Sequence, residues 1–148
     1  MNTIKTVRIA AAFAILIAVA TVGQAMMFGR GPKKPAASEF GLGPRTAAQG
    51  LYIATLQPQQ ELAVRKLQSV RVAVTDSKGN AIEGATIAVD GGMPQHGHGL
   101  PTKPRARQLA AGVYEVEGLR FNMGGWWELR LAITTPSGTD TVTFNLAL

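Results

Sequence analysis

The sequence predicts an all-β protein, an antiparallel sandwich of two packed sheets that follows an N-terminal export segment. From Leu51 onward, apolar and polar residues alternate in short runs such as Val70, Val72 and Val74, which is the period of half-buried strands. Glycine and proline clusters separate these runs, and no stretch after the N-terminal segment has the period of a helix. About seven or eight short strands in roughly 100 residues favour a sandwich, which can bury a core without disulfides.

The elements follow in order along residues 51–148, which we expect to form the domain. The alternation predicts strands over about 70–75, 85–89, 105–109, 113–117, 119–123, 127–133 and 142–146. Turn residues predict breaks at 76–80, 90–92, 124–125 and 136–138, and a hairpin around Gly112. The inward phase of these strands predicts a core that contains Val72, Ile87, Tyr114, Phe121, Trp127, Leu129 and Phe144.

The N-terminus has the pattern of an export signal. Lys5 and Arg8 precede an uncharged, mostly apolar run over residues 9–29, and small residues before Met26 permit cleavage after Ala25. The run is also long enough to span a bilayer, so residues 1–25 are expected to be a signal peptide or a membrane anchor through residues 9–29. Both alternatives place the domain in the periplasm or cell envelope. The Gly-, Ala- and Pro-rich stretch 26–50 is expected to be a linker.

Charge and cysteine content exclude some classes of partner and site. The chain carries a net charge of +6, yet residues 51–148 hold nine lysines and arginines against eight acidic residues. The basic excess therefore belongs to the export segment and linker, and a nucleic-acid partner is not expected. The chain has no cysteine, which excludes disulfides and thiolate metal ligands.

The loop Met93–Thr102 holds both histidines of the chain. Pro94 suits the second position of a β-turn over Met93 to His96, and His96 and His98 are two residues apart, so their side chains can share one side. Thioether and imidazole ligands suit copper(I) better than magnesium or calcium. The loop is therefore either a copper(I) site that uses Met93, His96 and His98 or an exposed polar loop.

Two residues of a later segment have alternative interpretations. Met123 is in phase with Phe121, so it is either a core residue or a fourth ligand at a strand end. Trp126 falls on the outward phase, where it could cover a copper(I) ion or pack at the edge of the sandwich.

Enzymatic chemistry is not expected. The loop contains no serine beside its histidines. A cupin-like metal site would need a glutamate where Thr102 and Lys103 stand, and a third histidine, which the chain lacks.

Several motifs together resemble the YtkA-like/FixH-like family of envelope domains. The resemblance covers about residues 68–134 and rests on the Met93-Pro94 to Thr102 loop, Gly112-Val113-Tyr114, and the segment Leu119 to Trp126. It implies an immunoglobulin-like sandwich, exported or membrane-anchored, with a link to copper handling or haem-copper oxidase assembly. It also places Met93, His96, His98 and Met123 at matching positions.

Two functions follow as hypotheses. The first is a non-enzymatic copper(I) module that passes its ion to a copper-receiving protein. The second is a FixH-like structural or assembly module for a membrane oxidase complex, without metal transfer. Binding of a small ligand at the loop end of the sandwich is a third.

Overall fold

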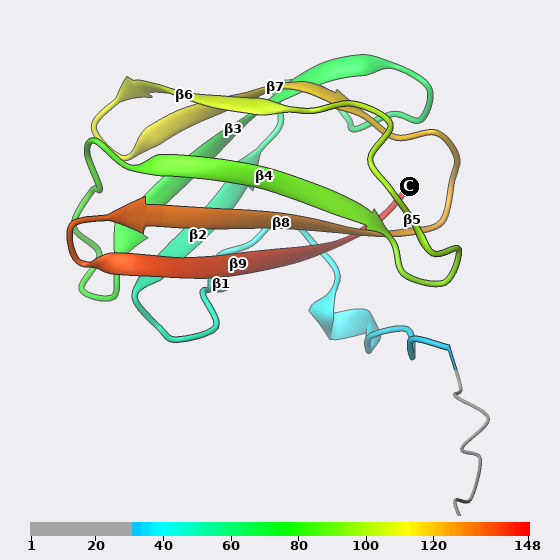
Figure 1. The fold of residues 1–148 in the computed structure, drawn as a ribbon, viewed down its shortest axis with the longest axis horizontal. Coiled ribbons are helices and arrows are strands. Elements are labelled where there is room, and N and C mark those ends of the chain that lie inside the picture. The colour runs from blue at the N-terminus through cyan, green and yellow to red at the C-terminus, as the bar shows by residue number, and fades with distance from the viewer. Residues whose placement is uncertain (1–30) are drawn as a thin grey trace, which may run out of the picture.

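The computed structural model describes residues 31–148, which form two antiparallel sheets (Figure 1). One sheet has five strands in the order β1-β2-β3-β7-β6, and the other has four in the order β5-β4-β8-β9. The strands are β1 (Arg45–Thr46), β2 (Tyr52–Gln57), β3 (Leu67–Asp76), β4 (Thr86–Met93), β5 (His98–Gly99), β6 (Arg105–Ala110), β7 (Val113–Arg120), β8 (Trp126–Thr135) and β9 (Gly138–Ala147). A short 3-10 helix, η1, spans Ala37–Glu39. The predicted all-β sandwich is confirmed.

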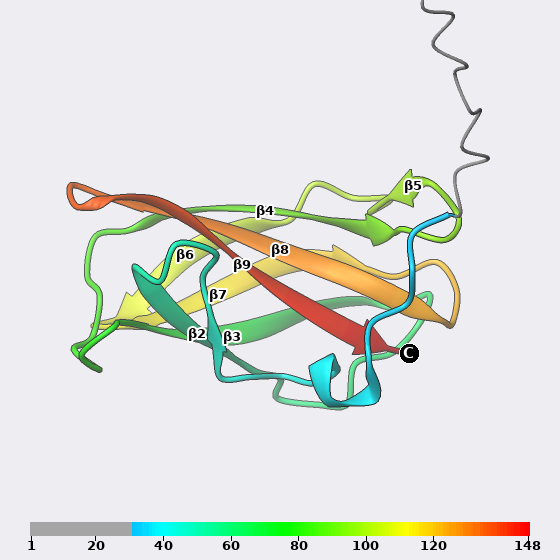
Figure 2. The same ribbon diagram turned by 90° about the horizontal axis from the view of Figure 1, so that it is seen from below.

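The two sheets lie face to face as two layers, which Figure 2 shows from the side. Strands β3, β5 and β7 are each followed by a strand of the opposite sheet, so three connections cross between the layers at the ends of the sandwich. The β4–β5 turn and the β7–β8 connection lie at the same end, on the right of Figure 1. This end carries the four predicted metal ligands, Met93, His96, His98 and Met123.

The core fills the space between the layers with the residues that the alternation predicts. All seven predicted core side chains are buried, and Trp127 and Phe121 are fully enclosed. In β8 the odd-numbered residues Leu129, Leu131 and Ile133 face the core, while Arg130 and Ala132 lie on the outer face. Burial of these apolar side chains between the two sheets is the main contribution to the stability of such a fold.

Part of the segment predicted as a linker packs onto the sandwich. Ala47 is buried in the core, and Phe40 pairs with Asn145 of β9. The carboxylate of Asp140, itself buried, accepts hydrogen bonds from the backbone N–H groups of Gln49 (2.9 Å) and Leu51 (3.1 Å). Asp140 therefore holds the turn before β2 against β9.

The predicted signal peptide or anchor, residues 1–25, and the apolar run 9–29 lie outside the described residues. Within residues 31–148, no helix has the length and apolar character to cross a membrane.

We expect Trp127→Ala to lower the free energy of unfolding by about 3–5 kcal/mol, because it deletes the largest enclosed side chain of the core. Urea denaturation followed by circular dichroism measures the change. Leu109→Ala is the matched control, since Leu109 is 39% exposed and its truncation should shift stability by no more than about 0.5 kcal/mol. Equal stability losses in the two variants would contradict the assigned core.

We expect the Asp140 carboxylate to make the free energy of unfolding depend on pH. Burial of its carboxyl would raise the pKa, but backbone N–H groups of Leu51, Gln49 and Thr141 outweigh this effect and lower the pKa below 3.8. A lowered folded-state pKa stabilises the fold above the unfolded-state pKa and loses that stabilisation as pH falls through the folded-state value. Wild type should therefore lose more stability than Asp140→Asn between neutral pH and about pH 3, in parallel urea titrations. Parallel pH curves for the two proteins would refute this role.

Candidate metal-binding site

The β4–β5 hairpin positions the Met/His loop. The backbone N–H groups of His96 and Gly97 both donate to the Met93 carbonyl oxygen at 3.0 Å, so the predicted turn over Met93 to His96 is present. Beyond the turn, His98 pairs directly across from Met93. The pairing requires glycine at position 92, because a Cβ atom there would lie 2.6 Å from the His98 carbonyl oxygen.

The two imidazoles lie together at the surface. The ring centroids of His96 and His98 are 5.7 Å apart with an interplanar angle of 26°, and both residues are exposed. The two rings therefore lie beside each other on one side of the loop. His98 also contacts the edge of the Trp127 indole, with ring centroids 6.2 Å apart.

Met93 lies inside the core, unlike the two histidines. Its side chain is only 2% exposed and belongs to the same apolar cluster as Trp127 and Ile87. The terminal methyl group, Cε, would lie 2.8 Å from a Cβ atom at Gly125, so the side chain reaches inward to the start of β8. Among the four predicted ligands, Met93 is the one that solvent does not reach.

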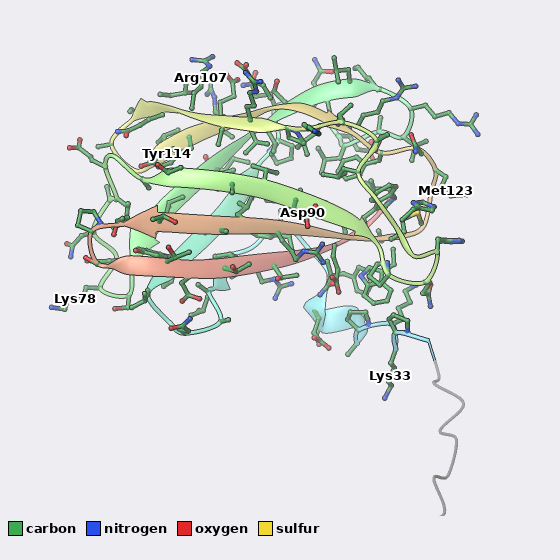
Figure 3. All side chains as sticks on the ribbon, viewed as in Figure 1. Lys33, Lys78, Asp90, Arg107, Tyr114 and Met123 are labelled. Carbon is green, nitrogen blue, oxygen red and sulfur yellow. The ribbon has the colours of Figure 1, made fainter. Side chains whose placement is uncertain are left out.

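Met123, unlike Met93, is exposed at the surface. The sequence left open whether it packs in the core, and the structure places it in the β7–β8 connection with 41% of its surface exposed. Figure 3 shows Met123 at the same end of the sandwich as β5. Its backbone carbonyl oxygen accepts a hydrogen bond from Trp127 Nε1 at 3.0 Å. Trp127 thus contacts both His98 and the segment that carries Met123.

The tryptophan beside the histidines is Trp127 and not Trp126. The outward phase of Trp126 permits a ring that covers an ion, but the side chain is only 4% exposed, and its Nε1 donates to Asn145 Oδ1 at 2.9 Å. This bond directs the indole toward β9. The sequence contains the signal for Trp127, because its inward phase and its place at the start of β8 bring it to the loop end of the core.

Acidic side chains near the loop are engaged by one arginine. Arg130 forms ion pairs with Asp90 (2.7 Å) and Glu128 (3.1 Å) on the outer face of the four-stranded sheet. The hydrogen bond from Arg130 is the main reason that the pKa of Asp90 lies below its usual value. Both carboxylates line a shallow hollow that also reaches His98. Residues 31–148 contain no group of three His, Cys, Asp or Glu side chains placed to hold a metal ion.

Comparison with known proteins identifies the family. Residues 46–132 match the YtkA-like family. Among solved structures, the chain is similar to the ZirS C-terminal domain, with 17% identity, a TM-score of 0.36, and coverage of 94% of this chain and 97% of that one. None of the curated proteins matches the chain. Because the family match covers more than half of the chain and includes the β4–β5 loop, the protein belongs to the YtkA-like family.

Proposed function

We propose that this protein is an exported, non-enzymatic module that holds one copper(I) ion with His96, His98 and Met123. The observation that carries the proposal is the stacked pair of exposed imidazoles at the end of the sandwich where Met123 is also exposed. The Trp127 indole links the β4–β5 loop to the β7–β8 connection, since it contacts His98 and donates a hydrogen bond to the Met123 carbonyl oxygen.

The spacing of the imidazoles is compatible with a shared ion. Metal–imidazole bonds are about 2 Å long, so two ring nitrogens on one ion lie no more than about 4 Å apart. Ring centroids 5.7 Å apart satisfy this limit after a modest rotation of each ring. Residues 95–99 are all exposed, which leaves the rings free to rotate.

The donor set favours a soft ion. Thioether sulfur selects copper(I), whereas magnesium and calcium prefer carboxylate and carbonyl oxygens. The nearby carboxylates of Asp90 and Glu128 are occupied by Arg130. The buried thioether of Met93 then serves in packing rather than as a ligand.

An exposed site is suited to transfer. A receiving protein can approach all three ligands from solvent, and a thioether can be exchanged without gaining or losing a proton. We therefore propose delivery to a copper-receiving protein or to a membrane oxidase complex in the cell envelope. An assembly module that binds such a complex without metal is the rival function, and copper(I) retention separates the two.

We expect the variant with His96→Ala and His98→Ala to bind copper(I) at least about a hundredfold more weakly than wild type, since loss of even supporting contacts costs about ten- to a hundredfold. Competition with a coloured copper(I) chelator under anaerobic conditions measures the affinity of the full chain. Protons compete with the ion for imidazole nitrogen, so wild-type affinity should weaken as the pH falls from about 8 to about 5.

Gln95→Ala is the matched control for the histidine variants, because Gln95 is exposed in the same turn and carries no nitrogen or sulfur ligand suited to copper(I). It should bind as wild type does. If the double histidine variant also retains wild-type affinity, the copper hypothesis is wrong and the assembly-module function replaces it.

We expect Met123→Leu to weaken copper(I) binding at least about tenfold without changing stability, because it removes an exposed sulfur while keeping an apolar side chain. Met93→Leu should instead lower the free energy of unfolding by up to about 1.5 kcal/mol, because it is a core substitution, and leave copper(I) affinity nearly unchanged. The chelator competition and urea denaturation are run on both variants. Weaker binding by Met93→Leu alone would place the ion on the core side of the loop instead.

A further inference from the structure

We propose that a second surface at the loop end of the sandwich docks the domain onto an anionic phospholipid membrane. This surface, called here the basic patch, consists of Arg65, Lys66, Lys103, Arg105 and Arg120 around the exposed side chains of Leu67 and Val64. It lies on the five-stranded sheet, whereas the Met/His loop lies on the four-stranded sheet.

Strand pairing gathers the patch from three separate segments. Leu67 at the start of β3 pairs with Arg120 at the end of β7, and the Arg65 N–H donates to the Phe121 carbonyl oxygen at 2.6 Å. Two shallow hollows flank Leu67, and one of them is lined by Lys103 and Arg105. In Figure 1 the start of β3, the end of β7 and the start of β6 lie together at the upper right.

The five cations of the patch form no ion pair within residues 31–148, where the ion pairs involve only Arg107 and Arg130. Lys66 Nζ donates a hydrogen bond to the neutral side chain of Gln60, Oε1, at 3.1 Å, which leaves its charge uncompensated. Three acidic residues border the hollows, and they offset this charge only in part. Glu115 and Glu117 both pair with Arg107, and Glu61 lines the same hollow as Lys66.

Apolar side chains at the centre of the patch favour a membrane over an acidic protein surface. Leu67 is 65% exposed, the highest value among the exposed large apolar residues of the described chain, and Val64 is 37% exposed. The segment between them is held in an uncommon conformation, with Arg65 at a φ of 61°. Basic residues around a projecting apolar side chain bind lipid phosphates while the apolar group enters the interface.

The orientation agrees with the sequence. Residues 31–36 leave the sandwich at the lower right of Figure 1, and the patch lies at the upper right, so both belong to the same end of the sandwich. An anchor through residues 9–29 would hold this end nearest the bilayer. The patch would then fix which side of the domain faces the lipid.

A reporter at position 67 tests the proposal in the full chain. The chain has no cysteine, so Leu67→Cys can be labelled at a single site with a polarity-sensitive dye. Lys78→Cys is the matched control, because Lys78 is exposed at the opposite end of the sandwich (Figure 3). The labelled proteins are mixed with vesicles of phosphatidylcholine alone or of equal parts phosphatidylcholine and phosphatidylglycerol.

We expect the dye at position 67 to shift to the blue on the mixed vesicles only, and the dye at position 78 to remain in water on both. Raising the ionic strength from about 0.1 M to about 1 M shortens the screening length from about 10 Å to about 3 Å and should reverse the shift. Each of Lys66→Gln, Lys103→Gln and Arg120→Gln should weaken the response about fivefold, whereas Lys78→Gln should not.

Three results would overturn the proposal. An equal shift on both kinds of vesicle would mean that charge has no part in the contact. An equal shift at positions 67 and 78 would mean that the contact is not specific to this end. A dye at position 67 that stays in water on the mixed vesicles would exclude membrane docking and leave an acidic protein surface as the partner.

Discussion

The edge-to-face contact of Trp127 with Phe121, together with the indole hydrogen bond, is the interaction on which the loop end of the sandwich depends. The ring centroids of these residues are 5.1 Å apart, and both side chains are fully enclosed. Edge-to-face pairs of this kind are favourable beyond the area they bury. The buried N–H group of the same indole is satisfied by the Met123 carbonyl, so the core cannot close without fixing the β7–β8 connection. Both exposed segments of the proposed site therefore take their positions from a residue that solvent does not reach.

Charge is distributed over the two sheets in different ways. On the four-stranded sheet, Arg130 bridges Asp90 and Glu128 and leaves that face nearly neutral beside the histidines. On the five-stranded sheet, Arg107 engages Glu115 and Glu117 in the same manner, while the cations nearer the loop end have no such partners among the described residues. A nearly balanced composition therefore conceals an uneven surface, which only the register of the strands makes visible.

The fold was largely predictable because alternation of apolar residues is a local signal with a global cause. In β3 and β8 the residues buried by the opposite sheet recur at every second position, and a period of two records this directly. In β7 the buried phase shifts between Val116 and Leu119, which is why the sequence predicts two strands where the structure has one. The same rule also indicates the position of Met93. Ile87, Val89 and Met93 share the odd phase of β4, so the phase of the strand, rather than the turn motif, decides where its side chain goes.

Features that depend on distant partners could not be predicted from alternation. Trp126 is on the outward phase, and its burial involves Asn145 of a neighbouring strand. Met123 follows the end of β7, so the alternation that suggested a core position no longer applies there. The turn before β2 is held by Asp140, about 90 residues later in the chain, and a Gly- and Pro-rich composition contains no sign of such a contact.

The close approach of Met93 to Gly125 has a consequence for how this loop end can evolve. Position 125 has a φ of 130°, and the Met93 methyl group occupies the space that a side chain there would need. The two positions therefore behave as one packing unit, although 32 residues separate them in the sequence. A larger residue at position 125 would need both a smaller residue at position 93 and a change of the backbone conformation, because a φ of 130° favours glycine. In an alignment of the family, covariation of this pair would mark the contact between the β4–β5 hairpin and the start of β8, while the exposed residues around it vary independently.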